Sequence, residues 1–279
     1  MIDIRPSPIA GTWYPKNSEE LQQTIDEQLR SVEITLPQGE VLGIVAPHAG
    51  HRYSGHVAAH AFKCLEGLEP EIVVVVAPLH SYYPGEIFTT EHDAYFTPLG
   101  QIPVEHEVLD LIDEQLQGNI DLRKIRQDTE HSLEIELPFL QRVLRQPFRL
   151  VPLMIMRQTS SVAASLGQAI AQSLQGKSFI LVASSDLSHF YPAHVAQKYD
   201  EAFLSRLEAF DPNAVINAED DGVGFACGRG AIATVLWAAR DLGADQVRIL
   251  RYAHSGDVTG DHHSVVGYGS AVIFRADKA

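Results

Sequence analysis

The stretch EIVVVVAP at 71–78 constrains the fold of this chain more than any other segment. It is a run of β-branched residues with no alternation of apolar and polar positions. A strand of this kind is covered on both faces, which is typical of a parallel sheet flanked by helices. Three further apolar runs have the same character and predict buried strands at 41–47, 148–156 and 178–185.

Helical patterns alternate with these strands along the chain. They lie at 17–31, 55–68, 105–117, 131–145, 161–174, 193–209 and 229–243. The last two apolar runs, 247–256 and 264–274, follow one another closely enough to form an antiparallel pair at one edge of the sheet. Repeated alternation of strand and helix predicts a single α/β domain over 1–279, with a largely parallel central sheet and helices on both faces.

Charge and cysteine content limit the partners and the compartment. The 21 Lys and Arg residues stand against 36 Asp and Glu, giving a formal charge of -15. Such a balance argues against nucleic acid or an anionic membrane as the main partner, because phosphate contacts require positive charge. Two cysteines do not make a disulfide framework, and no apolar run reaches membrane-spanning length, so we expect a cytoplasmic protein.

Histidines recur where the predicted strands end. His48 and His80 follow the first two buried strands, Asp186 and His189 follow a third, and His254 follows the next. Ligands of open α/β sheets bind beyond the carboxyl ends of the strands. We therefore expect these side chains to meet at one edge of the sheet.

Cys227 precedes a predicted helix in the stretch GVGFACGRG. A thiol at a helix start beside Arg229 is expected to have a lowered pKa, which would favour the thiolate as a nucleophile or a metal ligand. Cys64 instead lies among apolar helical residues and is interpreted as an inert core residue.

His131 lies at the start of the predicted helix 131–145, which Asp128 or Thr129 could cap. Its side chain either faces the site or makes only a local hydrogen bond, and the sequence favours neither.

No organic cofactor is indicated by the glycine-containing segments. GKS at 176–178 precedes a strand instead of a helix, and acidic residues precede GVGFACG where a dinucleotide fingerprint requires a strand.

Six motifs together resemble the Memo family, whose prokaryotic members are called AmmeMemoRadiSam system protein B. The motifs are AGTWYP (10–15), APHAGHRYSG (46–55), APLHS (77–81), TEHSLEIELPFL (129–140), SSDLSHF (184–190) and CGRG (227–230). The resemblance implies a fold similar to class III non-haem iron extradiol dioxygenases. It also implies a metal site formed by His48, His80 and Cys227, with Asp186 and His189 lining the same pocket.

Two positions depart from the family pattern. His51 stands where an aromatic residue is common, and Ser81 stands where a second histidine is frequent. Both departures leave the three implied ligands intact.

The resulting hypothesis is a metal-dependent redox enzyme of unknown substrate. Two histidines and a thiolate would suit Fe(II), Zn(II) or copper. His189 would act as general acid or base with the assistance of Asp186, and His131 and His254 would be further catalytic candidates.

Two alternatives retain the same pocket. In one, Cys227 is the nucleophile of a hydrolase with a histidine as its base. In the other, the pocket is a non-catalytic binding or adaptor site for a small molecule or a peptide. The resemblance further implies a radical-SAM protein and an AMMECR-type protein as functional partners.

Overall fold

The β-branched run at 71–78 forms strand β3 (Ile72–Pro78), which is buried along its whole length. The computed structural model describes residues 2–116 and 120–277. β3 lies between β8 (Arg149–Ile155) and β9 (Phe179–Ser184), and β2 (Gly39–Ala46) follows on the other side of β9. All four strands are parallel, as the pattern predicted.

Antiparallel strands extend this parallel centre at both ends. β11 (Gln246–His254) and β12 (Val265–Ala276) form the expected antiparallel pair, and β12 also pairs antiparallel with β2. At the far end β4 (Ile87–Thr90) is antiparallel to β8. Within the described residues the order is β10-β12-β2-β9-β3-β8-β4-β7, with β11 on β12; β10 is His189–Tyr191 and β7 is Leu122–Ile125.

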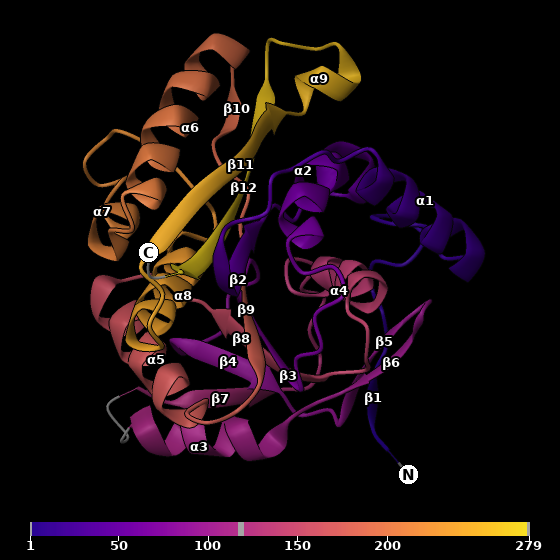
Figure 1. The fold of residues 1–279 in the computed structure, drawn as a ribbon, viewed down its shortest axis with the longest axis vertical. Helices are drawn as coiled ribbons and strands as arrows, with labels where there is room; N and C mark the ends of the chain where they lie inside the picture. The colour runs from indigo at the N-terminus through magenta and orange to yellow at the C-terminus, as the bar shows by residue number, and fades with distance from the viewer. Residues whose placement is uncertain (1, 117–119, 278–279) are drawn as a thin grey trace.

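Helices cover both faces of this sheet, confirming the α/β architecture (Figure 1). One face carries α1 (Ser18–Arg30), α2 (His51–Lys63) and α4 (Leu137–Val143). The other carries α3 (His106–Leu116), α5 (Ser160–Ser173), α6 (Ala193–Glu208), α7 (Pro212–Ile216) and α8 (Arg229–Asp241). The short α9 (Gly256–Thr259) follows β11.

A small second sheet was not predicted. It consists of β1 (Ile4–Arg5), β5 (Ala94–Thr97) and β6 (Gly100–Pro103), in the order β1-β5-β6. Strands of two to four residues are too short to show a periodic pattern, so the sequence carried little signal for them.

Two helix boundaries differ from the prediction. The helix expected at 55–68 begins earlier, at His51. The helix expected at 131–145 is a 3-10 turn, η1 (Glu134–Glu136), followed by α4. Asp128 does not cap a helix there, because its carboxylate accepts hydrogen bonds from the guanidinium of Arg5 and from the nearby backbone N–H of Glu130. The last residue of the helix predicted at 105–117 lies outside the described residues.

Among the helices described, none combines the length and the apolar character that crossing a bilayer requires.

Candidate metal centre

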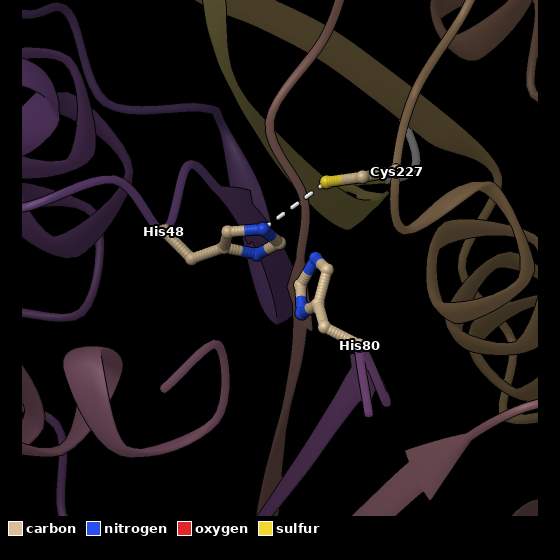
Figure 2. Close-up of side chains that lie close together, drawn as sticks. All are labelled: His48, His80 and Cys227. Atoms are coloured by element: carbon tan, nitrogen blue, oxygen red, sulfur yellow. Dashed lines mark hydrogen bonds between the residues drawn. The ribbon is translucent and has the colours of Figure 1, made fainter. Parts of the chain in front are cut away.

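Three side chains from distant parts of the chain meet at the carboxyl edge of the parallel strands. His48 follows β2, His80 follows β3, and Cys227 lies two residues before α8. One donor atom from each lies within 4.8 Å of the other two. Figure 2 shows the two imidazoles and the sulfur pointing toward one another. Cys227 Sγ lies 3.1 Å from His48 Nε2.

Asp186 joins the segments that carry His48 and Cys227. Its Oδ1 accepts hydrogen bonds from the backbone N–H of His48 at 2.8 Å and of Ala49 at 3.2 Å. Its backbone N–H points at Cys227 Sγ at 3.3 Å, and its carbonyl accepts from the Cys227 N–H at 3.2 Å. Burial raises the pKa of Asp186 to about 7, although both hydrogen bonds to its carboxylate oppose this.

The ring of His48 is oriented by Ser184, at the end of β9. Ser184 Oγ lies 3.0 Å from His48 Nδ1 and is also close to the Ser132 carbonyl (2.6 Å) and to Glu136 Oε1 (2.7 Å). The single hydroxyl hydrogen is directed to one of these two oxygens, so the hydroxyl accepts a hydrogen bond from Nδ1–H. Nε2 of His48 therefore keeps its lone pair for the site.

His80 has the same tautomer for a different reason. Its Nδ1 donates to Glu130 Oε1 at 2.9 Å, and its backbone N–H donates to Glu130 Oε2 at 2.6 Å. Burial acts to lower the pKa of His80, but the hydrogen bond and the charge of Glu130 outweigh it and raise that pKa. Nε2 of His80 is thus left to face the site, as in metal centres where a carboxylate orients a ligating histidine.

This donor set fits a metal ion. Two imidazole nitrogens and a sulfur around a tetrahedral ion would lie about 3.6 Å apart, given metal–nitrogen and metal–sulfur bonds of about 2.1 and 2.3 Å. The sulfur and His48 Nε2 are slightly closer than this, and the remaining separations are at most 4.8 Å. The three atoms are therefore close enough together to hold one ion.

The predicted lowering of the Cys227 pKa is wrong for the protein without an ion. Burial raises the pKa of the thiol, and the nearby charge of Asp186 raises it further. Arg229 does not compensate, because its guanidinium pairs with Glu219. The thiol is therefore protonated, and a thiolate there requires a cation.

His131 lies at the site, which answers the question that the sequence left open. Its ring stacks on His80, with centroids 4.7 Å apart, and meets the His48 ring edge-on at 5.4 Å. On its other face Trp13 stacks at 4.0 Å. Burial lowers the pKa of His131 to about 4, so this ring is neutral at physiological pH.

His189 and His254 are not part of the described cluster of three donor atoms. His189 is half-buried against Phe190 and Phe225. Burial lowers its pKa, and the nearby charge of His80 lowers that pKa further. His254 is on β11, which β12 separates from β2, and its Nδ1 lies 3.4 Å from Asp257 Oδ2. The structure thus places His131 against both candidate histidine ligands, and His254 on a strand two away from β2.

Four residues of the site received no role there from residue-level reasoning. They are Glu130, which orients His80, Ser184, which contacts the His48 ring, and Trp13 and Glu136. All four lie inside motifs that carried the family resemblance, and that was the signal available for them. The hydrogen bonds of Asp186 run to His48 and Ala49, so its predicted assistance to His189 stays a prediction.

Known proteins are similar to this chain in sequence or in fold. A model of the family described as "Memo-like protein" matches residues 5–272. A MEMO1 family protein of Methanosarcina mazei is 34% identical over 274 residues, covering 98% of this chain and 100% of that protein. Another, from Methanothermobacter thermautotrophicus, is 35% identical over 276 residues, covering 95% and 98% of the two chains.

Among solved structures, an uncharacterized Escherichia coli K12 protein has a similar fold. Its TM-score is 0.55 at 15% sequence identity, covering 82% of this chain and 99% of that one.

Proposed function

Because this chain belongs to the Memo-like protein family, we propose that it is a metal-dependent redox enzyme resembling non-haem iron dioxygenases. His48, His80 and Cys227 would hold the ion. The main support is that each imidazole has committed Nδ1 to a partner and presents Nε2 toward the same sulfur. Two imidazoles and a thiolate suit Fe(II), Zn(II) or Cu(I). Any of these ions would supply Lewis acidity to a bound substrate, and iron or copper would also supply electron transfer.

The neighbouring side chains would handle protons and position the substrate. We assign His189 as general acid or base, supported by a lowered pKa that leaves its ring neutral and able to accept a proton at physiological pH. Asp186 would hold the His48 and Cys227 segments in register and is itself close to titration at neutral pH. The neutral ring of His131 would border the reacting group, whereas His254 is a weaker candidate.

A pocket that shares wall residues with the surroundings of this centre is the proposed substrate site. Its volume is about 430 Å³, and its lining includes Trp13, Ala49, Tyr53 and Tyr268. Trp13 stacks on His131 and Ala49 directly follows His48, which connects the pocket wall to the centre, while the three donor side chains are outside its lining. Aromatic walls favour a small molecule or a peptide with an apolar or aromatic group.

Anaerobic elemental analysis tests the metal assignment. Wild-type protein should retain stoichiometric iron, copper or zinc, and Cys227→Ala should lose it while keeping its circular dichroism spectrum. Cys64→Ala is the matched control, because Cys64 is a buried free thiol at the opposite end of the sheet, in the pocket formed with Gly39 and Phe179. Full metal affinity in Cys227→Ala would refute the assignment.

A thiol hydrolase is the second candidate, and the 3.1 Å contact between Cys227 Sγ and His48 Nε2 favours it. With Ser184 at Nδ1, the three side chains have the order of nucleophile, base and orienting group. Against this, burial raises the pKa of Cys227 and lowers that of His48, so proton transfer from sulfur to imidazole is unfavourable. Activity that survives a chelator but not a thiol alkylator would support the hydrolase.

A non-catalytic adaptor would need the pocket but not the ligands, and the complete ligand set favours the enzyme.

We also propose a cytoplasmic location, which suits a free thiol at the site, and joint action with a radical-SAM protein and an AMMECR-type protein. Co-purification of the three proteins, expressed together with one of them tagged, tests that association.

A further inference from the structure

Arg5 is a buried cation that belongs to none of the roles above. It lies on β1, and its guanidinium covers the ring of Tyr95 on the paired strand β5 at 4.8 Å. Its nitrogens donate to the carboxylates of Asp128 and Glu134, each at 2.5 Å, and to the Glu130 carbonyl at 2.9 Å. Burying a guanidinium requires such complete pairing, because an unpaired buried charge is strongly destabilising.

All three partners lie in one short segment between β7 and α4. Residues 126–133 of that segment belong to no helix or strand, so side chains carry much of the support of their backbone. Glu130 is in the middle of this stretch, and its carboxylate accepts from His80 Nδ1 and from the backbone N–H groups of His131 and Ser132. Arg5 holds the segment on both sides of Glu130 and at Glu130 itself.

Building on the proposed metal site, we propose that Arg5 is a positioning residue for the ligand His80, acting through Glu130. The guanidinium fixes the backbone of Glu130, the Glu130 carboxylate fixes His80 Nδ1, and His80 Nε2 is thereby aimed at the ion. The planar fork of arginine is needed, because a lysine offers one compact ammonium and cannot reach two carboxylates and a carbonyl in this arrangement.

Arg5→Lys tests this with Co(II) as the probe, measured by chelator competition and by the thiolate-to-cobalt absorption band. Loss of a group that orients a metal ligand typically weakens metal binding about 10- to 100-fold, and we expect a loss of that size with an unchanged circular dichroism spectrum. Arg142→Lys is the matched control, because Arg142 also makes a two-nitrogen contact with one carboxylate, Asp26, but at the surface on α4. Its Co(II) affinity should equal that of the wild type.

A double-mutant cycle separates positioning from general support of the fold. If Arg5 acts through Glu130, Arg5→Lys should cost little further affinity in a Glu130→Gln background. Full additivity of the two losses, or wild-type affinity in folded Arg5→Lys, would overturn the inference while leaving the metal site itself standing.

Asp128→Asn replaces Arg5→Lys in the cycle if the lysine variant does not fold. It weakens the same contact but leaves Arg5 paired with Glu134, so no buried charge is left alone. Wild-type protein that binds no Co(II) would refute the proposed function, and this inference with it.

Discussion

Metal affinity should increase steeply with pH, because binding displaces protons that the ligands hold in the absence of an ion. Burial raises the pKa of Cys227, so its thiol must lose a proton to become a ligand. His48 loses none near neutrality, because burial lowers its pKa. One displaced proton changes the apparent association constant about tenfold per pH unit, or about 1.4 kcal/mol.

The increase of metal affinity with pH should be steeper at acid pH than near neutrality. Glu130 raises the pKa of His80 in spite of burial, so below that pKa a second proton must leave and the change approaches about a hundredfold per unit. Chelator competition with Zn(II) across the pH range gives the slope. Calorimetry in buffers of different ionisation enthalpy gives the number of protons directly.

Removal of the thiol provides the decisive comparison. Cys227→Ser should bind Zn(II) more weakly and release about one proton fewer, because a serine hydroxyl does not ionise in this range. Cys64→Ser should release as many protons as the wild type, since that thiol lies away from the site. A flat profile near neutrality in the wild type, or an unchanged slope in Cys227→Ser, would refute the reasoning.

Three further predictions concern the surroundings of the centre. Glu130→Gln keeps the shape of the side chain but removes the charge that orients His80, and should weaken Zn(II) binding about 10- to 100-fold by chelator competition; unchanged affinity would contradict that role. Burial lowers the folded-state pKa of His51 to about 4, so its contribution to stability, complete above its unfolded pKa of 6.5, is lost as the pH falls toward 4. His51→Phe gives up the hydrogen bond to the Ile135 carbonyl at neutral pH. Between pH ~7.5 and ~4.5, its free energy of unfolding in urea should fall by about 2 to 3 kcal/mol less than that of the wild type. An equal fall in both proteins would show that His51 is not the source of the acid sensitivity. Gly228→Ala should destabilise the protein by about 1 to 3 kcal/mol in the same assay, because the added methyl would clash with the backbone carbonyl oxygen of Ser184 and meet the Ser185 side chain at 2.8 Å; wild-type stability would show that the loop yields.

The sequence predicted the centre of the sheet because its signal was local. The apolar runs that became β2, β3, β8 and β9 are long enough to identify buried parallel strands without knowledge of their neighbours. Parallel strands in turn bring their carboxyl ends to one edge, so the strand-end rule placed His48 and His80 together. Cys227 was joined to them by its position before a helix and by the family resemblance.

The same rule leaves open how far His254 lies from the other side chains. Its strand does end at the expected edge, but β12 lies between β11 and β2, and two strand spacings amount to about 10 Å. Strand order is a property of the assembled sheet, and no local pattern around His254 reports it.

Tertiary structure alone decided which atoms of the candidate ligands face the shared site. Arg5 and Glu130 are 125 residues apart, His48 and Ser184 are 136 apart, and both contacts depend on burial that no short segment creates. Burial also reversed the expected pKa of Cys227, because desolvation of the thiol outweighs its position before a helix. Hydrophobic pattern and strand ends, both local, thus predicted the centre of the sheet and the meeting of His48 and His80, and the family resemblance added Cys227. Tautomer, protonation and supporting contacts depended on packing between distant segments.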